Sequence, residues 1–288
     1  MPQQRRQSVE AEVNPKTQAS VAARQEDLRR IARALEAAAE VCGSFSAGTV
    51  AVEFKDEGSP VTALDRGINE KLLQLLPRDG EGWLSEESAD DQSRLQKSRV
   101  WVVDPLDGTH EFLAGIPEWC ISIALVEDGR AVAGGICNPT TGETFLGSRE
   151  TGVTLNGKPV RVRACHGLES AVVLASRSET KRGEWERFRN APFEVRPVGS
   201  VAYKLACVAA GLADATWTFV PKHEWDVAAG AALVLASGGV VKTLEGAPPV
   251  FNRPNPWLDG LLAYSAGSRK QLESFLAERR KRGEGGAR

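Results

Sequence analysis

The chain has 288 residues, of which 42% are hydrophobic and 26% are charged, and its formal net charge is −2. This composition is typical of a folded globular protein and excludes a wholly disordered chain. The balance of 36 basic and 38 acidic residues argues against a main role in coating nucleic acid or a membrane surface.

No stretch approaches the roughly 20 apolar residues of a membrane helix, and the N-terminal end lacks the apolar core of a signal peptide. The five cysteines are widely spaced and form no CxxC pair. These features predict a cytoplasmic protein whose cysteines are reduced and hold neither disulfides nor zinc. At roughly 150 residues per domain, the length fits two domains or one large layered α/β unit.

The first half of the chain reads as two helices followed by an antiparallel sheet. Residues 1–18 are polar and aperiodic, which predicts a disordered tail. Apolar residues at spacings of three and four predict one helix around residues 28–39 and a second that starts near Asp65 and ends before Pro77. Three apolar, β-branched runs predict strands, at residues 99–104, 120–128 and 130–138.

Two dipeptides predict hairpins, Asp128-Gly129 and Asn156-Gly157. From about residue 168, short strands alternate with helical patterns, which indicates an α/β domain after an α+β domain. The expected strands are 171–176 and 214–219, and the expected helices are 200–211 and 224–239. The boundary falls near residues 148–168, which gives an N-terminal domain (19–155), a C-terminal domain (156–278) and a basic tail (279–288).

The most informative segment is Val-Val-Asp-Pro-Leu-Asp-Gly-Thr, where an apolar strand runs directly into Asp104 and Asp107 follows on a turn. The two carboxylates and the carbonyl of Leu106 can converge on one point. Such an all-oxygen set suits a hard cation such as Mg²⁺ rather than zinc or copper. The N–H groups of Gly108 and Thr109 then offer an anion site at the start of the next element. The alternative is an Asp-rich turn without a ligand.

Four further acidic residues have an ordinary role when each is taken alone. Glu86 and Glu87 end an apolar stretch, where adjacent glutamates are commonly solvated. Asp226 opens an Ala-rich helix and Asp65 opens the second predicted helix, where an aspartate is commonly the N-cap. Capping and metal ligation are compatible when a second carboxylate oxygen points into a cleft.

Together these segments resemble the inositol monophosphatase superfamily of Mg²⁺-dependent, lithium-sensitive phosphatases. The resemblance rests on Asp65, Glu86-Glu87, the run from Asp104 to Thr109 and the Trp-Asp-x-Ala-Ala-Gly motif around Asp226, and it covers roughly residues 20–275. It implies a five-layer αβαβα sandwich, α+β in its first part and α/β in its second, of the inositol monophosphatase and fructose-1,6-bisphosphatase type. It also implies an active site between the two halves and a homodimer.

The resemblance implies a role for each matching residue. The expected ligands of two or three Mg²⁺ are Glu86, Asp104, Asp107, Asp226 and the carbonyl of Leu106. Glu86 and Thr109 are expected to orient the attacking water, with Asp65 hydrogen-bonded to Thr109. The substrate phosphate is expected to contact Leu106, Asp107, Gly108, Thr109 and Asp226.

The identity of the phosphate ester is less directly indicated. Inositol phosphatases usually carry a glutamate that grips inositol hydroxyls seven residues before the metal aspartate, where this chain has Phe219. Their Gly-Glu-Glu is Ser85-Glu86-Glu87 here. Conversely, residues 55–62, 175–179 and 199–211 are similar to the bacterial 3'(2'),5'-bisphosphate nucleotidases, which remove the 3'-phosphate of adenosine 3',5'-bisphosphate.

That analogy places several residues near a nucleotide, with Phe219 lining the base pocket. The candidates are Ser176, Arg177, Gly199, Ser200, Lys204, Phe219 and His223. Each has an ordinary surface or core role as its alternative. His110 follows the run from Asp104 to Thr109 directly, and it has the same two alternatives, a contact with the substrate or an ordinary structural or surface role.

The sequence therefore predicts a Mg²⁺-dependent phosphomonoesterase that acts on a small phosphorylated metabolite, with adenosine 3',5'-bisphosphate as the favoured substrate. Inositol-1-phosphate is the first alternative, followed by histidinol phosphate and fructose-1,6-bisphosphate. A catalytically silent scaffold protein is the alternative from another class. The intact set of Glu86, Asp104, Asp107, Thr109 and Asp226 argues against it.

Overall fold

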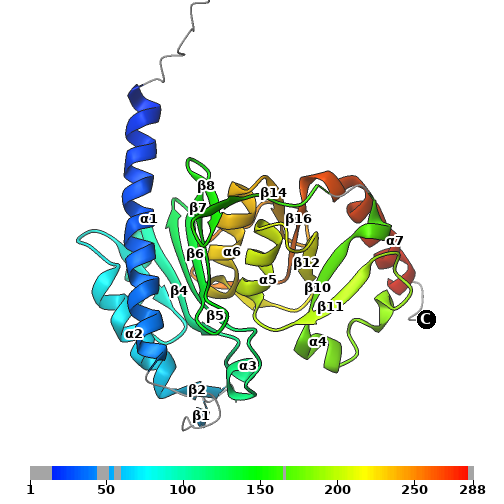
Figure 1. The fold of residues 1–288 in the computed structure, drawn as a ribbon, viewed down its shortest axis with the longest axis horizontal. Helices are drawn as coiled ribbons and strands as arrows, with labels where there is room; N and C mark the ends of the chain where they lie inside the picture. Colours follow the sequence, from blue (N-terminus) through cyan, green and yellow to red (C-terminus); the bar gives the residue numbers. More distant parts are fainter. Residues whose placement is uncertain (1–14, 44–51, 55–59, 165–166, 285–288) are drawn as a thin grey trace, which may run out of the picture.

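Five layers make up the protein in a computed structural model that describes residues 15–43, 52–54, 60–164 and 167–284 (Figure 1). Helices α1 (Pro15–Cys42) and α2 (Ala63–Leu75) cover the outer face of a seven-stranded sheet. Helices α5 (Val201–Ala209) and α6 (Glu224–Ala236) lie between this sheet and a five-stranded sheet. Helix α7 (Arg269–Glu284) packs on the far side of the second sheet. This arrangement confirms the predicted αβαβα sandwich.

The seven strands of the first sheet follow one another in chain order, and all pairs except the first are antiparallel. They are β3 (Gly82–Ser85), β4 (Arg99–Asp107), β5 (Cys120–Glu127), β6 (Arg130–Asn138), β7 (Glu143–Ser148), β8 (Gly152–Leu155) and β9 (Lys158–Val160). The hairpin residues Asp128, Gly129, Asn156 and Gly157 all have positive φ, as a two-residue type I′ turn requires. Both predicted hairpins are confirmed.

The five-stranded sheet has the order β11-β10-β12-β16-β14. Its strands are β10 (Val172–Ser176), β11 (Glu194–Val198), β12 (Ala215–Thr218), β14 (Gly239–Lys242) and β16 (Leu261–Ser265). Strand β10 is parallel to β11 and β12, whereas β16 is antiparallel to its neighbours. The short elements are β1 (Val52–Phe54), β2 (Pro60–Thr62), α3 (Thr109–Leu113), α4 (Arg177–Lys181), β13 (Lys222–His223), β15 (Trp257–Leu258) and 3₁₀ turns at Ser93–Gln96, Leu168–Ser170, Glu186–Phe188 and Ala266–Ser268.

Both chain ends carry more helix than the sequence predicts. Helix α1 begins at Pro15, inside the tail expected for residues 1–18, since proline is well accepted in the first turn of a helix. Helix α7 reaches Glu284, inside the basic tail expected from residue 279. Charge alone does not oppose a helix there, because Arg, Lys and Glu are good helix formers. Residues 1–14 and 285–288 lie outside the described part of the chain.

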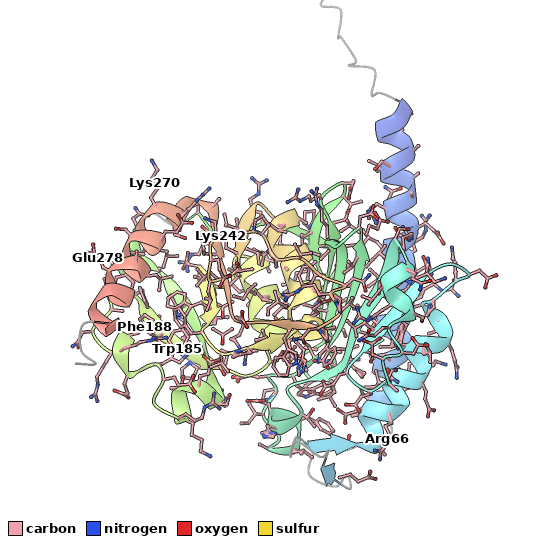
Figure 2. All side chains as sticks on the ribbon, turned by 180° about the vertical axis from the view of Figure 1, so that it is seen from behind. Arg66, Trp185, Phe188, Lys242, Lys270 and Glu278 are labelled. Carbon is pink, nitrogen blue, oxygen red and sulfur yellow. The ribbon has the colours of Figure 1, made fainter. Side chains whose placement is uncertain are left out.

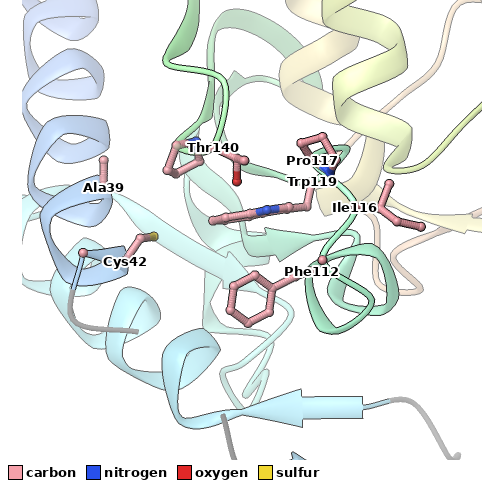
Figure 3. A pocket seen from close by; sticks show the side chains of 10 residues that line it. Ala39, Cys42, Phe112, Ile116, Pro117, Trp119 and Thr140 are labelled. Carbon is pink, nitrogen blue, oxygen red and sulfur yellow. The ribbon is translucent and has the colours of Figure 1, made fainter. Parts of the chain in front are cut away.

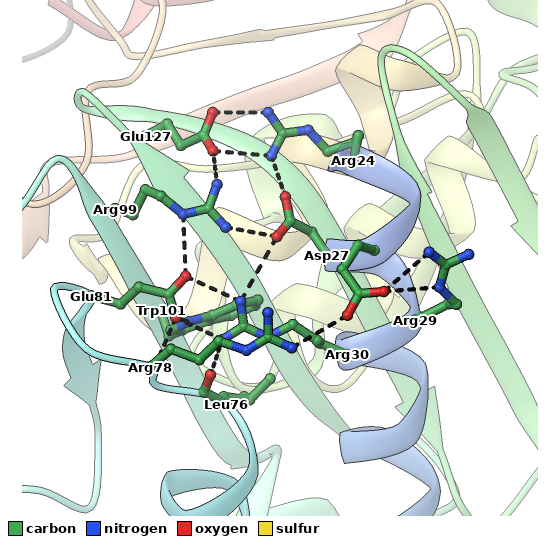
Figure 4. Close-up of polar contacts among 11 residues, drawn as sticks. Arg24, Asp27, Arg29, Arg30, Leu76, Arg78, Glu81, Arg99, Trp101 and Glu127 are labelled. Carbon is green, nitrogen blue, oxygen red and sulfur yellow. Dashed lines mark hydrogen bonds and ion pairs between the residues drawn. The ribbon is translucent and has the colours of Figure 1, made fainter. Parts of the chain in front are cut away.

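Helix α1 is fixed to the first sheet by a network of arginines and carboxylates (Figure 4). Arg24 donates to Glu127 at 2.8 Å, and Arg30 donates to Glu81 at 2.6 Å. Although burial alone raises it, hydrogen bonds from Arg30 and Trp101 hold the pKa of Glu81 at about 2. The network joins α1 to β4, to β5 and to Glu81, the residue before β3, and so holds the helix against this sheet.

An aromatic cluster fills the space between the second sheet and α7. Trp185 stacks on Trp217 with ring centroids 5.3 Å apart, and Phe188 lies 6.4 Å from Phe275 of α7. Figure 2 shows Trp185 and Phe188 beside this helix. Within the described residues no helix is both long and apolar enough to span a bilayer. Cys42, Cys120, Cys137 and Cys207 are free thiols, and Cys165 lies outside the described residues.

Two glycines allow α6 to pack closely in the centre of the sandwich. A Cβ atom on Gly230 would meet Leu205 Cβ of α5 at 2.3 Å. A Cβ atom on Gly134 of β6 would meet the carbonyl oxygen of Ala229 at 2.5 Å. Helix α6 is therefore wedged between α5 and the first sheet, which fixes the position of its first turn.

We expect Gly230→Ala to destabilise the protein by about 1–3 kcal/mol, because the new methyl group must displace Leu205. Gly67→Ala in α2 is the matched control, since its Cβ would meet Val41 Cγ1 at an ordinary 3.6 Å. The control should gain up to ~1 kcal/mol from the higher helix propensity of alanine. Urea denaturation midpoints measure both changes. A similar gain in both variants would show that α5 and α6 separate easily.

Candidate metal centre and active site

The Asp-Pro-Leu-Asp segment is a bulge at the end of β4, where the sequence predicts a turn. Asp104 pairs with Ser122 of β5 and Asp107 pairs with Cys120. Between these two pairs β4 advances by three residues, whereas β5 advances by two. The extra residue bends the strand. Pro105, which has no N–H, is tolerated there because a bulged residue does not need to donate a hydrogen bond to the neighbouring strand. The bend brings both carboxylates to the same pocket.

Gly108 allows the chain to leave this bulge and start α3. Its φ is +100°, and a Cβ atom there would meet Glu118 O and Trp119 Cβ at 3.1 Å. Thr109 follows, and its hydroxyl lies 3.1 Å from the carbonyl oxygen of Leu106 and 3.4 Å from Asp65 Oδ1. The expected contact between Thr109 and Asp65 is therefore present.

Asp65 and Asp226 occupy equivalent positions in two different helices. Neither is the N-cap that the sequence suggests: the caps are Thr62 for α2 and His223 for α6, and each aspartate is the third helical residue. Asp65 Oδ2 accepts the Thr62 N–H at 2.8 Å, and Asp226 Oδ2 accepts the His223 N–H at 2.9 Å. One oxygen of each carboxylate accepts the N–H of the N-cap residue and completes the capping box. The second oxygen is then available to the pocket.

Three carboxylates, two from β4 and one from α6, meet in the pocket. Asp104, Asp107 and Asp226 each offer an oxygen atom, and these atoms lie within 4.8 Å of one another. Burial raises the pKa of Asp104, and the charges of Glu86, Asp107 and Asp226 raise it further. Burial and the charges of Asp107 and Glu86 likewise raise the pKa of Asp226. A buried, all-oxygen cluster of like charges fits a hard divalent cation. Glu86 lines the same pocket outside this group of three.

Asp107 is held in place from the second domain. Its Oδ2 accepts the Ser200 hydroxyl and the Ala202 N–H, both at 2.6 Å. Burial raises the pKa of Asp107, and these two hydrogen bonds oppose the rise. Ser200 has φ +53°, which is uncommon for a residue other than glycine. Ser200 was expected near the substrate; in the structure it caps α5 and orients a metal-site carboxylate.

This pocket gathers most of the predicted site residues. Its described lining is Glu86, Asp104, Leu106, Asp107, Gly108, Thr109, His110, Glu111, Ser176, Ser178, Gly199, Ser200, Val201, Lys204, Lys222 and Asp226. Arg177, Phe219 and His223 are not among them. Arg177 pairs with Glu118 at 2.5 Å, and the His223 ring stacks on Trp225 at 4.2 Å.

Phe219 does not line a base pocket here. Its ring lies parallel to Phe188 with centroids 6.5 Å apart, and the guanidinium of Arg187 lies 4.2 Å above it. Phe219 therefore belongs to the aromatic cluster beneath α7, because β12 turns alternate side chains to opposite faces of its sheet. The prediction that Phe219 selects the substrate directly has no support in this geometry.

Two lysines stand in the same pocket as the carboxylates. The Lys204 ammonium is buried and donates to the carbonyl of Ser200 at 2.6 Å. Burial lowers the pKa of Lys204 to about 8, and the charge of Asp107 opposes the fall. The Lys222 ammonium lies 3.6 Å from Glu179 Oε1. Lys222 was missed in the sequence, because a lysine in so short a strand as β13 carries no pattern that separates it from a solvated one.

Another pocket lies at the end of α1, beside Phe112 and Trp119 (Figure 3). Its described lining is mostly apolar, and its polar side-chain groups are the thiol of Cys42, the indole N–H of Trp119 and the hydroxyl of Thr140. Its described lining offers no carboxylate oxygens for a cation, unlike the pocket lined by Asp104, Asp107 and Asp226.

Comparison with known sequences agrees with this assignment. A sequence profile of the inositol monophosphatase family matches residues 24–284. The chain is 37% identical over 204 residues to an inositol-1-monophosphatase of Mesorhizobium japonicum, which covers 68% of this chain and 76% of the relative. It is 34% identical over 203 residues to a 3'-phosphoadenosine 5'-phosphate phosphatase of Mycobacterium bovis, which covers 69% and 74%.

Solved structures share the fold. The extragenic suppressor protein suhB of Bartonella henselae superposes with a TM-score of 0.73 at 30% identity, over 85% of this chain and 96% of that one. CysQ of Bacteroides thetaiotaomicron, described as a bacterial member of the inositol monophosphatase family, superposes with a TM-score of 0.68 at 25% identity, over 84% and 97%.

We expect Asp104→Asn to stabilise the metal-free protein at pH 7. A carboxyl whose folded pKa lies above its unfolded value binds more protons when folded, so stability falls as pH rises between the two values. Removing this charge should raise Tm in EDTA by about 3 °C and abolish the rise in Tm that Mg²⁺ produces in the parent protein. Asp79→Asn, an exposed site, is the control. A lower Tm for Asp104→Asn in EDTA would contradict the repulsion argument.

Proposed function

Since the chain belongs to the inositol monophosphatase family, we propose that it is a Mg²⁺-dependent phosphomonoesterase and that its substrate is a 3',5'-bisphosphorylated nucleoside. The observation that carries the proposal is the composition of one pocket. Two buried carboxylates, Asp104 and Asp107, meet the half-buried Asp226 there, and Lys204 and Lys222 belong to the same lining. A cation site beside two ammonium groups suits a substrate that carries more than one anionic group.

These three carboxylates support the hydrolytic step. Asp104, Asp107 and Asp226 would hold divalent cations, which when bound supply the positive charge that neutralises a phosphate dianion and activates a water. The Thr109 hydroxyl has one hydrogen, for which Asp65 and the Leu106 carbonyl are acceptors. Its lone pairs then remain to accept a hydrogen bond from the attacking water and to orient it. The N–H groups of Gly108 and Thr109 would donate to the phosphate oxygens.

The lysine side of the pocket supports the choice of substrate. A phosphate bound at the carboxylates leaves Lys204 and Lys222 to contact a second anionic group, together with the hydroxyls of Ser176 and Ser178. Lys204 has a further N–H donor beyond those it gives to backbone carbonyls. The similarity to a 3'-phosphoadenosine 5'-phosphate phosphatase supports the same choice.

Inositol-1-phosphate is the second candidate. Glu111 lines the pocket, where a carboxylate can accept hydrogen bonds from sugar-alcohol hydroxyls, and burial raises its pKa. The similarity to an inositol-1-monophosphatase favours this reading. Phe219 no longer argues against it, because its ring lies in the aromatic cluster rather than in the pocket.

The same proposal includes a homodimer in the cytoplasm that acts on a small phosphorylated metabolite without a nucleic-acid or membrane partner. The dimer follows from the family resemblance, and the location from the sequence features described above. Light scattering of the purified chain measures the oligomeric state directly.

We expect Lys222→Met to raise KM for adenosine 3',5'-bisphosphate by about 10–100-fold, since a hydrogen bond to a charged group contributes roughly 1.5–3 kcal/mol. KM for inositol-1-phosphate should change little, because that substrate has no second phosphate. Lys181→Met, at an exposed position of α4, is the matched control. Phosphate release in Mg²⁺ measures all three proteins on both substrates.

Two outcomes would contradict the substrate assignment. An equal loss on both substrates would place Lys222 at the scissile phosphate. A parent protein that prefers inositol-1-phosphate would favour the second candidate and leave the metal centre in place.

A further inference from the structure

A short stretch before β15 is bound by residues of both domains. We term residues 250–253 the bridging segment. Its Phe251 is buried and donates its N–H to the carbonyl of Gly129, in the hairpin between β5 and β6, at 2.9 Å. The bridging segment therefore belongs to the C-terminal domain in sequence but is anchored on the first sheet.

Arg94 binds the bridging segment from the N-terminal domain. Its side chain is 1% exposed and donates to Asn252 Oδ1 at 2.7 Å and to the carbonyl of Arg253 at 3.0 Å. Asn252 returns a hydrogen bond from Nδ2 to the carbonyl of Arg94 at 3.2 Å. Asp90 holds the other edge of the guanidinium at 2.7 Å. The buried guanidinium is thus held by hydrogen bonds on both edges, and these bonds fix the position of Asn252 relative to the 3₁₀ turn at Ser93–Gln96.

Glu224 binds the bridging segment from α6. Its carboxylate is fully buried and accepts the N–H groups of Asn252 at 2.6 Å and Arg253 at 3.0 Å. Its own N–H donates to the carbonyl of Pro256 at 2.8 Å. Glu224 is the first residue of α6, two positions before Asp226. Two hydrogen bonds therefore tie the first turn of α6 to the bridging segment, and a third ties it to Pro256, three residues further along the chain.

Arg94 and Glu224, at the two ends of this chain of contacts, lead to two different acidic residues that line the pocket, Glu86 and Asp226. Arg94 packs against β3, where a Cβ atom on Gly82 would meet Arg94 Cβ at 3.0 Å. Strand β3 ends at Ser85, directly before Glu86. Glu224 leads directly to Asp226. Glu86 and Asp226 repel each other, so something must hold their segments together before a cation binds.

We propose that Arg94, Asn252 and Glu224 form a clamp that sets the separation between Glu86 and Asp226 and so tunes the affinity of the pocket for divalent cations. They are positioning residues, since none of them lines the pocket. The inference rests on the proposed metal dependence. The bridging segment transmits position because the contacts that join it to Arg94 and Glu224 are charge-assisted hydrogen bonds, and such partners around metal ligands tune affinity.

Asn252→Gly is the test, because Asn252 has φ +58° and glycine adopts that backbone conformation without strain. The variant removes both side-chain hydrogen bonds with Arg94 and keeps the backbone N–H that binds Glu224. Asn156→Gly is the matched control: Asn156 also has positive φ (+50°), and it also uses its side chain in a hydrogen bond, to the Thr144 N–H, but it lies at a hairpin tip.

Titration calorimetry of the full chain with MgCl₂ and with MnCl₂ gives the cation Kd, and Tm with and without Mg²⁺ gives a second readout. Asn252→Gly is expected to raise Kd on the order of tenfold and to shrink the Mg²⁺-induced rise in Tm, while kcat recovers at saturating Mg²⁺. Asn156→Gly is expected to lower Tm at most, with Kd unchanged.

The outcomes separate the clamp from the proposed function. If Asn252→Gly lowers Tm but leaves Kd at the parent value, the clamp is merely structural and the inference fails. If both variants raise Kd alike, the effect is general softening and the inference also fails. If the parent protein binds neither Mg²⁺ nor Mn²⁺, the proposed metal dependence fails and the clamp fails with it.

Discussion

The repulsion among the pocket carboxylates is the constraint on which the rest of the site depends. Asp104, Asp107 and Asp226 present oxygens within 4.8 Å of one another in a buried place, where an uncompensated charge is costly. No single element holds all three. The fold instead brings a bulged strand and the first turn of a helix from another domain to one point. Packing energy elsewhere in the sandwich offsets the cost, and a divalent cation removes it.

Contacts that hydrophobic packing alone does not provide hold β4, α5 and α6 at this point. Ser200 and Ala202 reach from α5 to orient Asp107 of β4. The bridging segment joins the first turn of α6 to Arg94. Ser200 binds Asp107 directly and Glu224 lies two residues before Asp226, so a shift of either contact would move a pocket carboxylate.

The sequence predicts well those features that depend on local pattern. The hairpins at Asp128-Gly129 and Asn156-Gly157 follow from the need for positive φ, and the strand before Asp104 follows from its apolar run. Features that depend on tertiary contact escape it. Phe219 follows β12 and packs with Trp217 in the aromatic cluster, and Lys222 reaches the pocket from β13, which pairs with β15. Both placements depend on contacts between segments that are distant in the sequence. Only the family resemblance predicted that Asp104 and Asp226 lie in one site, since sequence spacing alone cannot show which distant segments meet.

The two capping aspartates show how a local rule contributes to a distant site. Asp65 and Asp226 each use one oxygen to close the first turn of a helix, which fixes the rotamer of the side chain. The second oxygen is then aimed without further support, at Thr109 in one case and at the carboxylate cluster in the other. The first turn of a helix therefore holds a functional side chain in a fixed orientation. Because the same residue serves both purposes, its replacement would weaken a helix and a site together, and only a measurement of cation binding beside stability separates the two losses.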